Sequence, residues 1–117
     1  MFVTVLVRRL KQGKTYEDFL QAWYPDKGFG FPGHGPFLAR NINDPNEILA
    51  YGLVDLPDRA SLDRELARVI QQEAVRHDRI ADVIESTSVR AVFELTHTFD
   101  FSTDDAVRAG RPSWLPA

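Results

Sequence analysis

The chain has 117 residues, with 14 lysines and arginines against 17 aspartates and glutamates, a net charge of -3 and no cysteine. This is the composition of an ordinary globular domain, and the length suits one domain with its own core. The lack of cysteine excludes disulfides, thiolate nucleophiles and cysteine-ligated metal centres.

The charge and hydropathy patterns also limit the partners. A slightly acidic chain without a basic block indicates that nucleic acid is not a partner. No apolar run is long enough to span a membrane, so we expect no membrane association. The first residues lack the basic stretch of a secretory signal, and we therefore expect a cytoplasmic protein.

The first expected element is a strand over Phe2–Leu10. Val3, Val5 and Val7 alternate with other apolar residues such as Leu6, so both faces of this strand are apolar. A strand with one face in water alternates apolar and polar residues instead. The pattern therefore predicts a strand that is covered on both sides.

A helix is expected next, with Thr15 as its N-cap and Asp18 three residues later in a capping-box arrangement. Its apolar residues fall on one stripe at helical spacing: Tyr16, Phe19, Leu20 and Trp23. Pro25 stops the helix after Tyr24.

Residues 25–36 hold four of the seven glycines and three of the seven prolines. So many breakers predict a loop without regular structure. The loop is long for a small domain and carries Phe29 and Phe31, which is typical of a binding loop rather than of a solvated linker.

Two strands are expected at residues 37–42 and 47–56. A turn at residues 43–46, which contains the turn-favouring Pro45, joins them into an antiparallel hairpin.

A long helix should follow, with Asp58 or Ser61 as its N-cap, and its apolar periodicity continues to about Glu85. The last expected strand covers residues 89–99. The folded domain is therefore predicted to span residues 1–101, and residues 102–117 to form an extended tail with an apolar anchor at Trp114.

The order of these elements is β-α-β-β-α-β, which predicts an α+β ferredoxin-like domain with a four-stranded antiparallel sheet. Two helices can cover only one face of such a sheet, whereas the first strand is apolar on both. We therefore predict a homodimer that packs sheet to sheet.

The order of the elements and the sequences of residues 2–8 and 84–95 resemble those of the dimeric α/β-barrel superfamily. The resemblance covers about residues 2–99. It implies small ferredoxin-like domains paired through their sheets, with a ligand between sheet and helices. The superfamily includes cofactor-free quinone-forming monooxygenases, haem-degrading monooxygenases and small polyketide cyclases, and the fold does not select among these activities.

The candidate catalytic residues are Glu73 and His77 on the long helix. At ~100° per residue they fall ~20° and ~60° from Leu62, within the apolar stripe, and residues four apart can meet. Glu73 could orient His77 as a base, or His77 could ligate a metal or haem. The alternative is that the pair is half exposed or bonded to the backbone at an outward-tilting helix end.

Six more side chains are candidates for substrate binding: Tyr24, Phe29, Phe31, His34, Arg40 and Tyr51. They are aromatic groups near the loop or polar groups that interrupt apolar strands. Arg8 and Arg40 could each bind an anionic or phenolate ligand, or form a strand-end salt bridge. For His34 the alternative is solvation, for Tyr51 it is packing, and His97 suits packing or a dimer contact.

The Gly-x-Gly at residues 28–30 lacks the preceding strand and following helix of a nucleotide-binding loop. The histidines have no metal-ligand spacing, so we predict neither a metal site nor a cofactor.

Three functions remain. In the leading one, a small, largely apolar or aromatic molecule binds in a sheet–helix cleft, as in a cofactor-independent monooxygenase or cyclase. The alternatives are a haem-binding or haem-degrading protein that uses His77, and a non-catalytic binding or assembly module whose tail docks across the dimer. The residues leave open whether the protein is an enzyme.

Overall fold

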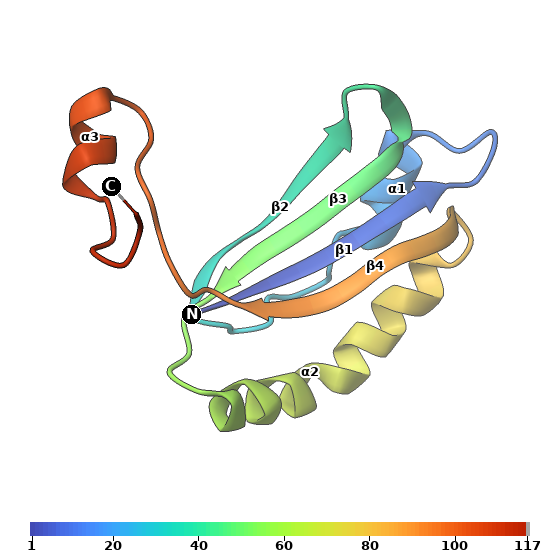
Figure 1. Ribbon diagram of the computed structural model, residues 1–117. Coiled ribbons are helices and arrows are strands. Elements are labelled where there is room, and N and C mark those ends of the chain that lie inside the picture. The colour runs from blue at the N-terminus through green and yellow to red at the C-terminus, as the bar shows by residue number, and fades with distance from the viewer. Residues whose placement is uncertain (117) are drawn as a thin grey trace.

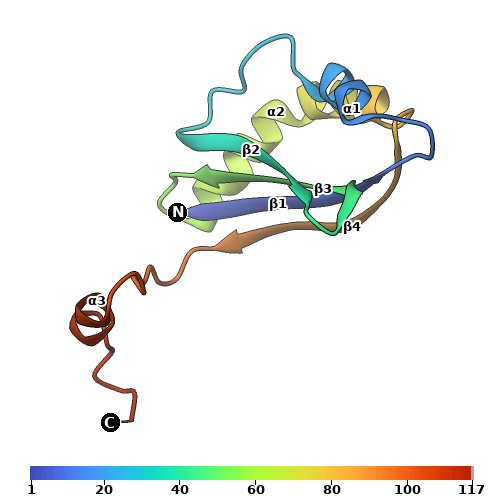
Figure 2. The same ribbon diagram turned by 90° about the horizontal axis from the view of Figure 1, so that it is seen from above.

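The structure, a computed structural model, describes residues 1–116. Four strands form one antiparallel sheet in the order β2-β3-β1-β4: β1 (Phe2–Leu10), β2 (Gly33–Asn41), β3 (Asp44–Val54) and β4 (Ile84–Glu94). Helices α1 (Tyr16–Trp23) and α2 (Arg59–Ile80) lie on one face of this sheet (Figures 1 and 2). This confirms the predicted ferredoxin-like βαββαβ arrangement. Within residues 1–116, no helix combines the length and apolar character that crossing a membrane requires.

Both helices begin at the expected caps. The Thr15 hydroxyl accepts a hydrogen bond from the Asp18 backbone N–H at 3.1 Å, and the Asp18 carboxylate accepts one from the Thr15 N–H at 2.8 Å. These two bonds complete a capping box. Asp58 caps α2 and accepts a hydrogen bond from the Ser61 N–H at 2.8 Å.

The end of α2 and the position of β4 differ from the prediction. The helix ends at Ile80 rather than near Glu85, and β4 covers residues 84–94 rather than 89–99. Residues 86–88 are polar, but they lie in an edge strand, where Ser86 and Thr87 pair with β1 and the register shifts at Ser88. The pairing extends from Ile84 opposite Leu10 to Glu94 opposite Phe2, and this ladder sets the register.

The predicted loop is also too long, because β2 begins at Gly33. Gly33 has φ +142°, and a Cβ there would lie 2.0 Å from the Leu53 carbonyl oxygen. Only glycine allows this close approach, so the residue read as a breaker is what starts the pairing with β3. The pairing is irregular between His34 and Phe37.

The hairpin between β2 and β3 is tighter than expected. Asn41 pairs with Asp44, so the turn is formed by residues 42–43 rather than 43–46. As a result, β3 starts at Asp44 and ends at Val54, earlier at both ends than the predicted 47–56.

The inner face of the sheet packs against the helices in two separate clusters. The larger lies where α1, the end of α2 and the start of β4 meet, and consists of Leu10, Phe19, Trp23, Ile48, Ile80 and Val83. The smaller contains Phe2, Val54 and Leu62. The helix α2 thus contacts the sheet through Leu62 near its start and Ile80 at its end.

The outer face of the sheet is apolar as predicted. Val5 lies opposite Tyr51 in β3 and Ala91 in β4, and Tyr51 lies opposite Phe37 in β2. The ring of Phe93, on the same face, is 53% exposed. No helix in the described range 1–116 covers this face (Figure 2).

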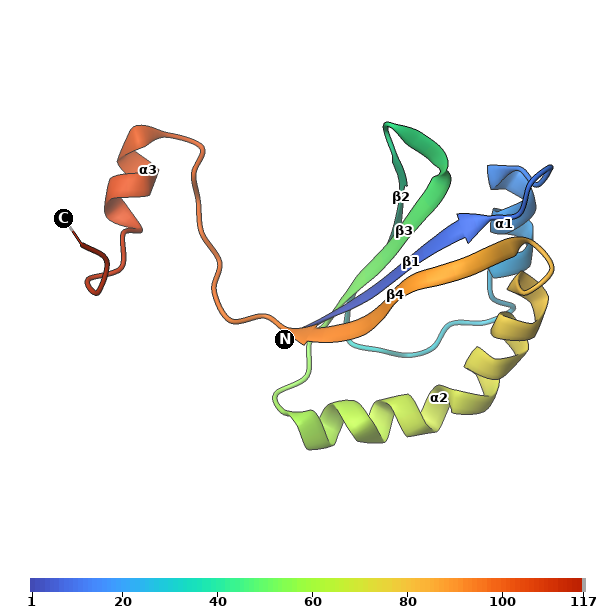
Figure 3. The same ribbon diagram turned by 45° about the vertical axis from the view of Figure 1, so that its right-hand side comes forward.

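Residues 95–116 form an arm that leads away from the sheet (Figure 3). It holds a short helix, α3 (Asp104–Ala109), where an extended tail was expected, because Thr103 caps a helical turn there. The rings of His97 and Phe101 stack on opposite sides of Phe99, with centroids 5.7 and 5.8 Å away. The radius of gyration is 17.6 Å, well above the ~13 Å of a compact domain of this length, as a protruding arm requires.

The larger of the two hydrophobic clusters should contribute most to the free energy of unfolding. Phe19 is fully buried and stacks on Trp23, so Phe19→Ala should lower the free energy of unfolding by about 3–5 kcal/mol through lost burial and a cavity. Urea unfolding at fixed protein concentration measures this. Ile42 is 97% exposed in the hairpin turn, and Ile42→Ala should change the same free energy by less than about 0.5 kcal/mol. Equal effects of the two substitutions would contradict the assignment of the core.

Candidate functional site

A cleft of about 350 Å³ lies between α2 and the inner face of the sheet. The helix lines it with Leu62, Leu66 and Val69, and the middle of β3 lines it with Ala50 and Gly52. The small residues of β3 leave room under the helix that larger side chains would fill. A concave, mostly apolar space of this size is typical of small-molecule sites.

The loop before β2 forms one wall of the cleft. Phe29 and Phe31 both line it, and their rings stack with centroids 6.3 Å apart. Two side chains of α2 hold this wall: Arg68 donates a hydrogen bond to the Phe29 carbonyl at 2.6 Å, and Gln72 donates one to the Lys27 carbonyl at 2.9 Å. The loop therefore places both of its aromatic rings at the cleft.

The far end of the cleft is polar and is built by Glu73, Arg76 and His77. Arg76 donates from Nη1 to the Glu73 carboxylate at 2.9 Å and from Nε to the Trp23 carbonyl at 3.0 Å. The His77 Nε2 lies 3.6 Å from the other carboxylate oxygen of Glu73. The pair that the helical spacing singled out therefore meets, and it meets at the cleft.

Arg90, the second polar neighbour of His77, determines which ring nitrogen of His77 carries the proton. Nη2 of Arg90, on β4, lies 3.1 Å from Nδ1 of His77. A guanidinium only donates hydrogen bonds, so Nδ1 accepts and the ring proton resides on Nε2, which faces Glu73. Burial, and then the charges of Arg90 and Arg8, lower the pKa of His77 below its usual 6.5. The imidazole is therefore neutral at pH 7.

Both ring nitrogens of His77 are engaged in the structure. Nδ1 accepts from Arg90 and Nε2 carries the proton, so the ring offers no free lone pair unless Arg90 moves. Within residues 1–116, no group of three or more His, Asp or Glu side chains could hold a metal ion.

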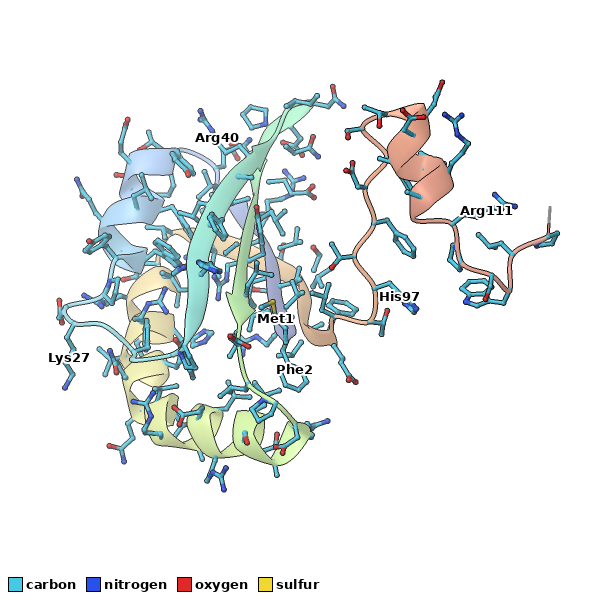
Figure 4. The ribbon with its side chains drawn as sticks, turned by 90° about the vertical axis from the view of Figure 1, so that its left-hand side faces the viewer. Met1, Phe2, Lys27, Arg40, His97 and Arg111 are labelled. Atoms are coloured by element: carbon cyan, nitrogen blue, oxygen red, sulfur yellow. The ribbon has the colours of Figure 1, made fainter. Side chains whose placement is uncertain are left out.

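Two predicted binding residues lie away from the cleft. Tyr24 is 71% exposed and does not line it. Arg40 stacks over the ring of Tyr16, with its guanidinium carbon 4.6 Å from the centroid, and lies beside α1 (Figure 4). His97, in the arm, is also remote from the helices (Figure 4).

Tyr51 and His34 border the cleft, but from the sheet. The neighbours of Tyr51 in β3 are the inner-facing Ala50 and Gly52, so strand alternation turns its ring outward, where it stacks on Phe37 at 5.0 Å. The ring of Tyr51 thus packs on the outer face of the sheet. His34 is exposed and lies in β2 rather than in the loop.

The sequence analysis missed Arg76 and Arg90. Arg76 lies about -40° from Leu62 on the helical wheel, as central in the stripe as His77, so the same arithmetic locates it. Arg90 lies within the strand expected at residues 89–99, but nothing in the sequence showed that its side chain contacts α2. Only the register in which β4 pairs with β1 shows that Arg90 lies on the inner face of the sheet.

Comparisons with known proteins agree with this architecture. The chain matches a "putative antibiotic biosynthesis monooxygenase" from Nitrosomonas europaea with a TM-score of 0.60 and 19% identity, over 83% of this chain and 100% of the other. It matches a second, from Chloroflexus aurantiacus, with a TM-score of 0.54 and 16% identity, over 85% and 96% of the two chains. No protein-family model and no curated protein matches the sequence.

The fold and the comparisons define a ferredoxin-like α+β domain with a four-stranded antiparallel sheet. At these identities the likeness establishes the fold, and the chemistry must be argued from the cleft.

The neutral state of His77 is directly testable. Its pKa, followed by NMR of the ring protons against pH, should lie below 6.5 and should rise in Arg90→Gln, because a repelling charge is removed. Arg64→Gln removes a charge near the exposed start of the same helix and should leave the pKa unchanged.

The same shift makes stability depend on pH. Unfolded His77 binds its proton more readily than folded His77, so the free energy of unfolding should fall as pH drops below 6.5 through the lowered pKa. His77→Gln should remove that part of the pH dependence in urea titrations. An NMR pKa at or above 6.5 would contradict the geometry.

Proposed function

We propose that the protein binds a small apolar or aromatic molecule in this cleft and acts on it as a cofactor-independent monooxygenase. The observation that carries the proposal is the apolar cleft with an imidazole–carboxylate pair at one end. The names of the structural neighbours support the reaction class.

The chemistry would use the substrate itself as reductant. An aromatic ketone with an acidic ring CH₂ loses a proton to give a stabilised carbanion, which donates electrons to O₂. The CH₂ becomes C=O, one oxygen atom of O₂ enters the product and the other leaves as water. The four electrons that O₂ accepts all come from the substrate carbon.

The residues supply the proton transfer. A neutral His77 can accept the substrate proton at Nδ1 once Arg90 turns away, and the Glu73 carboxylate beside Nε2 then stabilises the imidazolium. Phe29 and Phe31 provide flat apolar surfaces for an aromatic ring. The apolar surroundings keep water from the carbanion.

We also propose that the active form is a homodimer that packs through the outer faces of two sheets. That face is a continuous apolar surface of Val5, Tyr51, Ala91 and their neighbours, and Phe93 leaves half of its ring exposed. Apolar sheet faces of this kind are covered in stable proteins. The arm, with Phe101 and Trp114 mostly exposed, supports docking of the arm across such a dimer.

The enzymatic proposal is tested with dithranol, a tricyclic aromatic ketone with an acidic CH₂. Wild-type protein should consume O₂ and form the corresponding quinone, followed by an oxygen electrode and absorbance. Leu66→Trp fills the cleft from α2 and should lower kcat/KM at least about tenfold, because the indole takes up space that the substrate would occupy. Ile70→Trp is the matched control, because Ile70 lies one turn further along α2, is 67% exposed and does not line the cleft.

Two results would contradict the enzymatic proposal. One is no oxygen consumption above the rate without protein. The other is an equal loss of rate in Leu66→Trp and Ile70→Trp, which would place the reaction outside the cleft.

The dimer is tested by light scattering. Wild-type protein should have twice the chain mass, and Phe93→Asp should give the monomer mass, because it buries a charge in an apolar interface. Ile70→Asp puts the same charge on an exposed position of α2 and should leave the dimer intact. A monomeric wild-type protein, or a dimer that survives Phe93→Asp, would contradict a sheet-to-sheet dimer.

A further inference from the structure

Arg8 is a charged side chain in the interior. It follows the apolar residues of β1 onto the inner face of the sheet and is only 4% exposed. Its Nε has no hydrogen-bond partner, and no ion pair among residues 1–116 includes Arg8. A buried guanidinium without a partner is costly, since ionised groups in the interior are normally paired.

A recess lies beside Arg8 at the polar end of the cleft. It has a volume of about 20 Å³ and shares Leu6, Trp23, Glu73, Arg76 and His77 with the main cleft, while Arg8 and Ile80 close it. A space of this size holds one water molecule or one oxygen atom of a ligand. The recess therefore lies next to the main cleft, on the side where Arg8 is buried.

The charges around the recess are unbalanced. Arg76 and Arg90 act on Arg8 from α2 and β4, and Glu73 is the carboxylate that opposes them. Glu73 is already engaged by Arg76 at 2.9 Å. Burial, reinforced by the two neighbouring arginines, lowers the pKa of Arg8 to about 10. The guanidinium groups of Arg8 and Arg76 thus line the recess and that of Arg90 lines the neighbouring main cleft, and of the residues that the structure describes, Glu73 is the one carboxylate that lines either space.

We infer that this end of the cleft is a carboxylate-binding subsite, and that the ligand is an aromatic or alicyclic carboxylate. One carboxylate oxygen occupies the recess beside Arg8 and the other meets Arg90 at the cleft side. Arginine suits such planar, two-point recognition of a carboxylate. The inference rests on the proposed function, because the apolar cleft holds the body of the same ligand.

A carboxylate fits better than a phosphate. The recess admits one oxygen atom and is walled by the apolar Leu6 and Ile80, so a tetrahedral dianion would bury more charge and more volume than the space allows. The apolar main cleft likewise favours a hydrophobic acid over a polar metabolite.

The test compares 2-naphthoate with 2-naphthamide, which has nearly the same shape but no charge, by calorimetry at pH 7. Wild-type protein should bind the carboxylate at least about tenfold more tightly, the usual effect of charge-assisted hydrogen bonds. In Arg90→Gln, on the exposed edge strand, and in Arg8→Met, which keeps the buried volume, that preference should fall to about twofold or less. Arg64→Gln removes a charge from α2 outside the cleft and should keep the full preference.

The possible results distinguish failure of the carboxylate subsite from failure of the whole cleft as a binding site. If both naphthalenes bind wild-type protein equally, the subsite is absent while the apolar cleft stands. A preference that persists in both Arg8→Met and Arg90→Gln also overturns the subsite. If neither compound binds, the cleft is not a small-molecule site and the proposed function fails with it. Circular dichroism shows that each variant is folded before binding is measured.

Discussion

The position of β1 at the centre of the sheet is the constraint on which the rest of the structure depends. It pairs with β3 along one edge and with β4 along the other for its whole length. Its alternating residues therefore enter both faces: Phe2 and Leu10 join the two inner clusters, and Val5 lies in the outer apolar surface. The same alternation brings Arg8 to the inner face, where the packing leaves it without a partner.

The cleft follows from how α2 rests on this sheet. The helix is anchored to the sheet by Leu62 near its start and by Ile80 at its end, and between these points it passes over the small residues Ala50 and Gly52 of β3. Packing at two ends over a surface of small residues leaves a cavity rather than a filled core. The loop with Phe29 and Phe31 closes one side, held by hydrogen bonds from Arg68 and from Gln72.

Patterns within one element and the order of the strands could be predicted from the sequence, whereas the register between paired strands could not. The Thr15 cap and the meeting of Glu73 with His77 depend on local spacing, and both are present. The start of β2 depends on how closely Gly33 approaches β3, and the position of β4 on its ladder with β1. Tyr51 is a second example. The sequence predicted that Tyr51 lies in a strand, but it did not show which face of that strand packs against the helices.

Under the proposed function, the polar end of the cleft would link substrate recognition to reactivity through Arg90. In the structure its guanidinium donates to Nδ1 of His77, so the only lone pair of the neutral ring is occupied. An anionic oxygen is a stronger acceptor than an imidazole nitrogen, so a bound carboxylate draws this donor away and frees Nδ1. Under the proposed function, His77 is then a base only while a ligand of the right charge is present, and Glu73, 3.6 Å from Nε2, stabilises the proton it gains. The arginine that binds the substrate would in this way also hold the base inactive in its absence.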